Sequence, residues 1–579
     1  MRKARLFVAL SLILAALFTS IACGGTQPPK PAGKQGGIFI NGQAGGDAET
    51  LNWILAADAS SSGYASHTVD SLATFNNKLE LQLRCLAKDV EISQDGLVYT
   101  VTIRDDLKWS NGSQVTAEDY VYTLGNLMFS DWMNYPYKSM WQEEVAGNKV
   151  FVTPQVVNAT TFTITRQTAN PDFVYSIYDL QPYPKYIATK YEGDVKTFTE
   201  APEFNNLTYT GNLGPYRFKE WNRNDKYVVE RNPDYYLGRP IGAPYFDQYV
   251  IKLFGSSATM QAALEAGDIT HCGIEPEKVN KFMGLKNIDV YTVPTTGYTL
   301  LAYNQRANGW EGLKKQAIRQ ALSMSINKET VSQSILLGFG QPAFSFLSPN
   351  SPLYDDKSVV KYGVGPLYDK EKAAEILYQE GYGVKQENGT IKATNKDGGL
   401  LQLVLVTDQA SQASQDIALQ VRKELLALGI ETRVKLVPWP TLLDQYVRNK
   451  VPGSVKEAGY NNGHDAVSAE SWDMMLIGLT GGLLSPTSAE VVFTTEGGMN
   501  YFGYSNPEVD ELFRRLKTKE ALDKNMRQQL SSKLSLLLSQ DQPFDFVVFQ
   551  KANQGFQKNV VGIEPGISMW YNYYLWRFE

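Results

Sequence analysis

The chain has 579 residues, of which 43% are hydrophobic, so it is too long for a single core and too apolar for a disordered protein. Its 55 basic and 61 acidic residues are mixed along the whole length, which leaves no basic stretch suited to nucleic acid. Three cysteines and three histidines are too few for a disulfide framework or a Cys/His metal cluster. We therefore expect two or more packed domains that hold neither a metal nor a cofactor.

The N-terminus has the pattern of an export signal. Residues 1–22 contain three cations, a short apolar run and small residues before Cys23, and the apolar run is too short to span a bilayer comfortably. The tetrapeptide from Ser20 to Cys23 resembles a bacterial lipobox, in which the cysteine thiol carries a diacylglycerol anchor. An ordinary signal peptide cut nearby is the alternative. Residues 23–35 are rich in Gly and Pro and are predicted to be a flexible tether.

Strand and helix patterns alternate in the body of the chain. Residues 97–103 alternate apolar and polar side chains, which predicts a half-buried strand, and a capping-box-like start at Thr116 predicts a helix. Apolar stripes at helical spacing follow in residues 313–326 and 414–429, and strand patterns in 430–437 and 472–479. Residues 449–471 form a polar insertion, either on the surface or beside a cleft. This alternation predicts α/β layers around largely buried sheets.

Five segments in order resemble blocks of the family 5 solute-binding proteins of ABC importers, a group that contains dipeptide-, oligopeptide- and nickel-binding proteins. The segments are residues 95–128, 213–240, 318–331, 425–445 and 501–513. The chain departs from the second block where Asn212 and Leu213 replace the usual Thr before Gly214. The resemblance implies an α/β fold of the class II periplasmic-binding-protein type, with two lobes around a ligand cleft and an extra domain.

The resemblance also implies domain boundaries. Domain I, the first lobe, would comprise residues 36–73, 206–297 and 549–579. Domain II, the extra domain, would comprise residues 74–205, and domain III, the second lobe, residues 298–548. The solute would bind between the two lobes, and closure of the lobes would bury it.

The resemblance carries particular ligand positions over to this sequence. Trp439 lies where peptide-binding relatives have a Trp after a strand, and an indole there offers an apolar face and one donor. Leu479 stands where the relatives carry a Trp, and Gly482 where they carry an Asp that pairs with the α-ammonium of the peptide. Without that carboxylate, a buried ammonium would be costly. A neutral or polyhydroxylated solute, or a peptide held by its backbone, fits this change.

Two further groups of candidate ligand residues precede these. Tyr135, Tyr137 and Trp141 lie in an aromatic-rich segment of the predicted extra domain, where packing inside that domain is the alternative. Ser62 and Tyr64 lie after the first strand, in the place of a loop that contacts the ligand in relatives.

No catalytic function is expected. The sequence contains no G-x-S-x-G, H-E-x-x-H or P-loop string. We predict a lipid-anchored, monomeric binding protein on the outer face of the cytoplasmic membrane that captures a peptide or similar small solute for an ABC permease and its ATPase. The alternatives are an oligosaccharide-binding importer component, and a sensor or adhesin of the same fold without transport.

Overall fold

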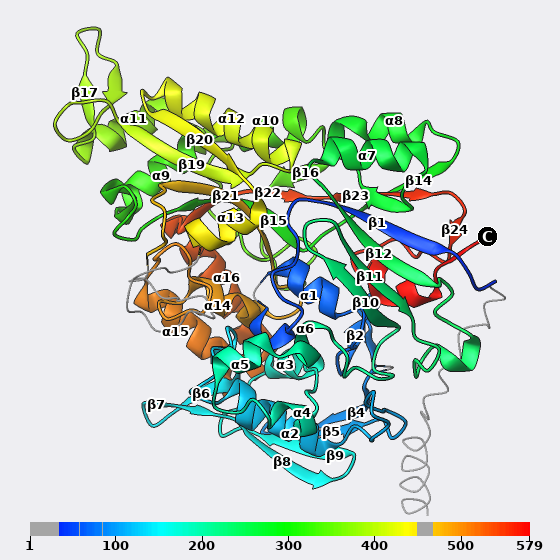
Figure 1. Cartoon of the computed structure of the whole chain (residues 1–579). Coiled ribbons are helices and arrows are strands. Elements are labelled where there is room, and N and C mark those ends of the chain that lie inside the picture. Colours follow the sequence, from blue (N-terminus) through cyan, green and yellow to red (C-terminus); the bar gives the residue numbers. More distant parts are fainter. Residues whose placement is uncertain (1–33, 57, 84, 448–466) are drawn as a thin grey trace, which may run out of the picture.

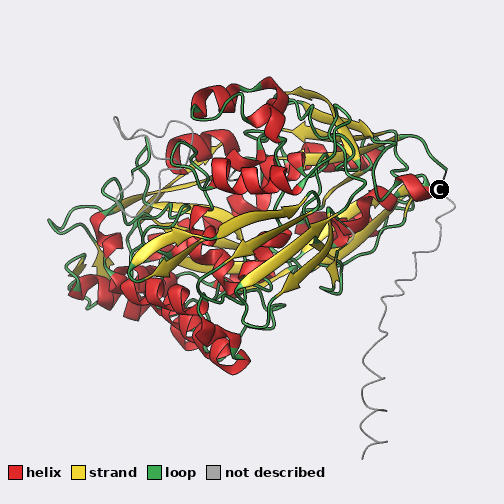
Figure 2. Cartoon of the chain, turned by 90° about the horizontal axis from the view of Figure 1, so that it is seen from below, coloured by secondary structure: helices red, strands yellow, loops and turns green. Residues whose placement is uncertain are grey.

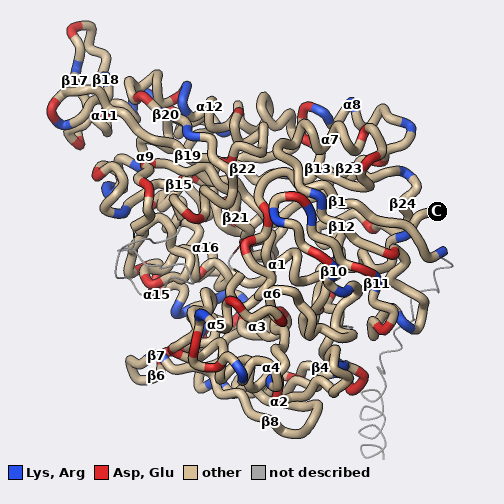
Figure 3. The backbone as a smooth tube through the Cα atoms, in the orientation of Figure 1, with Lys and Arg blue, Asp and Glu red and all other residues tan. Residues whose placement is uncertain are grey.

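The computed structural model describes residues 34–56, 58–83, 85–447 and 467–579. The predicted signal sequence, Cys23, most of the tether and residues 449–466 of the polar insertion lie outside the described residues. Within the described parts, no helix combines the length and the hydropathy needed to cross a bilayer. Lys and Arg residues are interspersed with Asp and Glu residues along the described chain (Figure 3).

A seven-stranded sheet forms the centre of the first lobe. Its strands are, in spatial order, β10 (Tyr216–Asn222), β11 (Lys226–Arg231), β12 (Gln248–Phe254), β1 (Ile38–Ala44), β13 (His271–Gly273), β23 (Ala552–Gln557) and β14 (Ile288–Val293). β1 runs parallel to β12 and β13, whereas β23 is antiparallel to both of its neighbours. The helices of this lobe are α1 (Ala59–Ala65), α7 (Ser257–Ala266) and α8 (Val279–Met283).

A six-stranded sheet forms the centre of the second lobe. Its strands are, in spatial order, β16 (Gly340–Pro342), β22 (Phe544–Gln550), β15 (Gly297–Tyr303), β21 (Met474–Thr480), β19 (Gln402–Asp408) and β20 (Glu431–Val437). Leu300 and Ala302 belong to one buried cluster, and Leu301 and Tyr303 to another, so both faces of the sheet are covered. A sheet buried on both faces explains why β21 is a continuous apolar run.

The helices of the second lobe only partly follow the predictions. They are α9 (Gln316–Ser325), α10 (Lys328–Thr330), α11 (Lys370–Gln379), α12 (Gln412–Ala427), α13 (Trp439–Thr441), α14 (Glu490–Phe493), α15 (Pro507–Leu516) and α16 (Lys524–Asp541). The helix predicted to end at Gly429 is confirmed, since α12 is followed by Gly429 in the left-handed region with a φ of 93°. The stripe predicted from residue 313 is interrupted, because Lys315 is extended and α9 begins after it.

The extra domain has a four-stranded sheet of β4 (Ala87–Ile92), β5 (Val98–Ile103), β9 (Thr161–Thr165) and β8 (Thr153–Asn158). The predicted strand at residues 97–103 is confirmed by β5, which buries alternate side chains. The predicted capping box is confirmed too, since Thr116 and Asp119 cap α2 (Ala117–Tyr122). The remaining elements are β6 (Gln142–Val145), β7 (Asn148–Phe151), α3 (Phe173–Tyr178), α4 (Lys185–Ala188), α5 (Val195–Glu200) and α6 (Pro202–Asn205).

Three further two-stranded ribbons complete the described sheets. They are β2 (Thr74–Phe75) with β3 (Leu81–Gln82) at the start of the extra domain, β17 (Gly383–Lys385) with β18 (Ile391–Ala393) in lobe 2, and β24 (Val560–Val561) with β25 (Arg577–Phe578) in lobe 1. Helices lie on either side of the band of strands (Figure 2). This α/β arrangement of two large sheets and a smaller domain confirms the predicted fold class. We use lobe 1, extra domain and lobe 2 for the predicted domains I, II and III, and their boundaries stay a prediction that the membership of the three sheets supports.

Candidate functional site

Two short segments join the sheets of the two lobes. β14 leads into β15 through residues 294–296, and β22 leads into β23 through Lys551 alone (Figure 1). The Thr295 hydroxyl of one segment donates to the carbonyl of Gln550 beside the other, at 2.8 Å. The backbone N–H of Gly481 donates to the carbonyl of Thr296, also at 2.8 Å. Two bodies joined only by such short adjacent segments have the geometry of a hinge.

A cavity of about 450 Å³ lies at this crossing. It is lined by Thr295, Thr296, Gly297, Tyr298, Thr299, Gly478, Leu479, Thr480, Gln550, Lys551 and Ala552. Leu479 is half-buried, while its neighbours Gly478 and Thr480 at the end of β21 are exposed. The size is in the range of small-molecule sites, and a few apolar side chains among backbone and hydroxyl groups suit a solute that forms hydrogen bonds.

Trp439 lies between the two lobes. It begins α13 directly after β20 and is half-buried. Across the interface it meets Gly46 of lobe 1, where an added Cβ atom would lie 2.2 Å from Cδ1 and 2.6 Å from Cγ of the indole. Asp408, at the end of β19, faces the neighbouring Gly45, and burial raises the pKa of its carboxyl. The sequence predicts Trp439 as a candidate ligand residue, whereas it does not single out Asp408.

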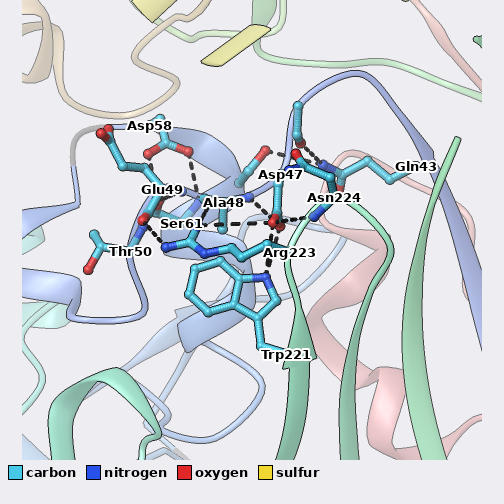
Figure 4. A network of polar contacts seen from close by, with 12 residues as sticks. Gln43, Asp47, Ala48, Glu49, Thr50, Asp58, Ser61, Trp221, Arg223 and Asn224 are labelled. Atoms are coloured by element: carbon cyan, nitrogen blue, oxygen red, sulfur yellow. Dashed lines mark hydrogen bonds and ion pairs between the residues drawn. The ribbon is translucent and has the colours of Figure 1, made fainter. Parts of the chain in front are cut away.

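A polar network holds the loop that carries Gly46 to the β10–β11 hairpin (Figure 4). The buried Asp47 carboxylate accepts hydrogen bonds from Trp221 Nε1 and from the backbone N–H of Asn224, each at 3.0 Å. Arg223 stacks on the Trp221 ring at 3.5 Å and donates to the carbonyls of Ala48 at 2.7 Å and Glu49 at 2.9 Å. A loop tied down at so many atoms presents a fixed surface to lobe 2.

The two candidates on α1 have different environments. Ser62 is exposed on the helix surface and stays a candidate. The ring of Tyr64 is 1% exposed and stacks on Tyr227 with the ring centroids 4.7 Å apart. Tyr64 therefore holds α1 against β11, which corrects its assignment as a candidate ligand residue.

The three aromatic candidates of the extra domain also differ in their burial. Trp141 is 2% exposed and packs edge-on against Phe173 at 5.4 Å, so it belongs to the core and has no free face; this corrects its assignment as a ligand contact. Tyr135 and Tyr137 are half-buried and in edge contact at 5.7 Å. Tyr137 also packs against the core of lobe 2, and burial and the charge of Asp58 raise its pKa to about 12. Tyr137 thus lies where all three parts of the molecule approach one another.

Gly482 lies in a tight turn after β21. A Cβ atom added there would lie 2.3 Å from the carbonyl oxygen of Ser485 and 2.6 Å from the Ser488 hydroxyl. No side chain, and so no carboxylate, fits at this position without moving the backbone. The predicted ligand positions that the structure gathers around the lobe interface are therefore Trp439, Leu479 and Tyr137.

The histidines and cysteines of the described chain have packing roles. His271 contacts Asn41 and Gln554, each at 2.7 Å, and burial lowers its pKa to about 4, so it is a packed residue of the lobe 1 sheet. Cys85 and Cys272 are buried free thiols. Among the described residues no group of three or more His, Cys, Asp or Glu side chains is arranged to hold a metal ion.

Known proteins resemble this chain over nearly its whole length. The family model described as bacterial extracellular solute-binding proteins, family 5 Middle, matches residues 84–501. The oligopeptide-binding protein AppA of Bacillus subtilis (strain 168) is 26% identical over 577 residues, which cover 97% of this chain and 96% of that protein. A match of this extent relates the two chains as wholes and not through one shared domain.

Two solved structures have the same fold. AppA from Bacillus subtilis in complex with a nonapeptide superposes with a TM-score of 0.78 at 22% identity, over 94% of this chain and 100% of that one. NikZ from Campylobacter jejuni in complex with Ni(L-His) has a TM-score of 0.74 at 21% identity, over 93% and 99%. The chain belongs to the bacterial extracellular solute-binding proteins of family 5, which are substrate-binding components of ABC transporters and not enzymes.

Proposed function

We propose that the chain captures a peptide or a similar small solute between its two lobes and delivers it to an ABC permease driven by its ATPase. The observation that carries the proposal is the cavity at the crossing, which lies on the only two segments of the described chain that connect the large sheets. Rotation about these segments would open and close the space next to Leu479 and Trp439. Family membership supports the transport role.

The solute is a peptide held mainly through its backbone, or an uncharged molecule such as an oligosaccharide. Gly482 leaves no room for a carboxylate, and Leu479 supplies an apolar surface in place of an indole. A peptide's α-ammonium buried at this place would lack its counter-charge, which costs several kcal/mol, on the order of a thousandfold or more in affinity. The crossing cavity instead offers hydroxyl and backbone groups from Thr295, Thr299 and Thr480.

The protein is placed on the outer face of the cytoplasmic membrane by lipid on Cys23. The residues that support this are the signal-like segment 1–22 and the Gly- and Pro-rich residues 23–35. Acyl chains on the thiol and the new N-terminus give stable anchoring, because a single chain binds a membrane only marginally. The binding unit is a monomer. A sensor or adhesin of the same fold would share all of these features except the permease partner.

The proposal is tested by identifying what the protein carries. The full-length protein is purified in detergent, denatured, and the released small molecules are analysed by mass spectrometry. Recovery of peptides or oligosaccharides that rebind the emptied protein supports the proposal. An emptied protein that binds no member of peptide and sugar pools, measured by calorimetry, contradicts it.

A further inference from the structure

The extra domain and lobe 1 share one hydrophobic core. A single buried cluster runs from Phe39 and Tyr249 of lobe 1 into Val101 and Phe162 of the extra domain. Backbone hydrogen bonds join the two where Leu72 and Ala73 donate to the carbonyls of Leu180 and Tyr178. Because separating this interface would expose apolar surface, the two parts move as one body.

The extra domain meets lobe 2 through a buried carboxylate. Asp172 occupies the N-cap position of α3, but its side chain makes no cap there and is engaged instead by lobe 2. Its side chain is 1% exposed; it accepts hydrogen bonds from the hydroxyl of Thr487 at 2.9 Å and the backbone N–H of Thr487 at 3.3 Å. Arg527 of α16 forms an ion pair with it and also donates to the carbonyl of Leu484 at 3.0 Å.

The surroundings of this cluster are charged on both sides. A cavity of about 390 Å³ lies between the extra domain and lobe 2. On one side Arg166 pairs with Glu143 at 3.5 Å, and on the other Lys517 pairs with Glu490 at 2.6 Å. Charged groups regain their hydration when an interface opens, whereas apolar surface does not. This interface therefore suits contact that forms and breaks, in contrast to the shared apolar core between the extra domain and lobe 1.

The extra-domain side of the cluster lies away from the β22–β23 passage. In Figure 1 the passage from β22 to β23 runs across the upper half of the molecule, whereas α3, which follows Asp172, lies in the lower half. Because the contacts of Asp172 cross from the extra domain to lobe 2, a rotation about residues 294–296 and Lys551 that opens the lobes would separate Asp172 from Arg527 and Thr487. Leu484 and Thr487 belong to the segment that follows Leu479 and Gly482, so the cluster also determines where the edge of the candidate site lies.

We propose that Asp172 and Arg527 form a latch between the lobes and act as positioning residues for solute capture. When the lobes close, the Asp172 carboxylate of the extra domain forms an ion pair with Arg527 and a hydrogen bond with Thr487 of lobe 2. These contacts fix the 481–488 segment beside the solute. Asp172 itself does not touch the solute. This inference rests on the proposed capture by closure and adds the residues that hold the closed state.

The test is a double-mutant cycle on the full-length protein in detergent. Fluorophores on cysteines introduced at the exposed Ile92 of the extra domain and Leu419 of lobe 2 report the distance between the two bodies. Asp172→Asn and Arg527→Gln are each expected to lower the ratio of closed to open molecules by about fivefold, and the double variant by little more, because the partners are coupled. Thr487→Val, which removes one hydroxyl, is expected to have a smaller effect of the same sign.

The matched control is Arg217→Gln with Asp234→Asn, an exposed ion pair at 2.6 Å within lobe 1, which should leave the ratio unchanged. Should Asp172→Asn fail to fold, Thr487→Val and Arg527→Lys carry the test. The latch is overturned if every folded variant has the same fraction of closed molecules as wild type. It is also overturned if the control pair shifts this fraction as much as the Asp172 and Arg527 variants do. The distance between the fluorophores is measured with no solute added, so failure of the latch is distinct from failure of the proposed function. If the proposed function is wrong, the fluorophore distance in the wild-type protein does not change when any peptide or sugar pool is added.

Discussion

Replacing Gly46 with alanine should act as a wedge between the lobes. Gly46 is buried against Trp439 of the other lobe, and an added methyl would lie 2.2 Å from Cδ1 and 2.6 Å from both Cβ and Cγ. Carbon atoms in contact lie about 3.5–4.0 Å apart, so the overlap exceeds an ångström. The overlapped atoms are at the root of the indole side chain, so a change of rotamer cannot relieve the clash. Either the Trp439 backbone moves or the lobes stay apart.

The expected size follows from overpacking at a tight contact, about 1–3 kcal/mol. Because the clash exists only between lobes, this cost falls on the closed state and appears as weaker solute binding, by roughly 5- to 150-fold. The stability of each lobe should change little. The dissociation constant is measured by calorimetry with the solute identified by mass spectrometry, and the closed fraction with the fluorophore pair on residues 92 and 419.

Gly63→Ala is the matched control, because Gly63 lies on α1 of the same lobe and an added methyl there meets no atom within 4 Å. It should bind as wild type does. If Gly46→Ala keeps wild-type affinity and closed fraction, then Gly46 and Trp439 do not meet in the bound state, and closure does not bring the two lobes together at this contact.

Three other perturbations test separate features of the molecule. Trp439→Ala should weaken binding by roughly two- to tenfold without unfolding the protein, since a stacked indole contributes about 0.5–1.5 kcal/mol beyond its buried area; unchanged affinity removes it from the site. Cys23→Ser should move the protein into the aqueous phase in detergent partitioning, and retention in the detergent phase would refute lipidation. Burial raises the pKa of Asp70 to about 6, above its unfolded value, so ionisation opposes folding. The free energy of unfolding should therefore fall by up to about 3 kcal/mol between pH 4 and 7, and in denaturant titrations Asp70→Asn should lack this fall. If wild type and Asp70→Asn lose stability in parallel over this range, the fall does not come from Asp70.

Local patterns in the sequence predicted local structure well. The alternating strand β5, the capping box at Thr116 and the glycine after α12 all depend on interactions within a few residues, which periodicity and capping rules describe. The failure at Lys315 is instructive for the same reason. Its extended backbone interrupts an apolar stripe that reads as one helix, and nothing in the local pattern marks the break.

The site was less accessible to prediction, because its decisive contacts join distant parts of the chain. Asp47 and Trp221 are 174 residues apart, and Asp172 and Arg527 are 355 residues apart, so no spacing rule links them. Tyr64 resembles a ligand residue by position, and only the partner Tyr227 shows that its ring is used for packing. Trp439 could be placed at the lobe interface because matching of family blocks, unlike periodicity, carries information about position in the fold; its contact with the solute stays a prediction.

The position of β23 affects how the chain folds during synthesis. This strand, drawn from residues 552–557, inserts between β13 and β14, although both of those were completed more than 250 residues earlier. A chain made from its N-terminus must therefore keep two strand edges apart and unpaired until synthesis is nearly finished. Such edges readily pair with other chains. Truncation of the last residues should thus cause aggregation through the part of the molecule that was synthesised first.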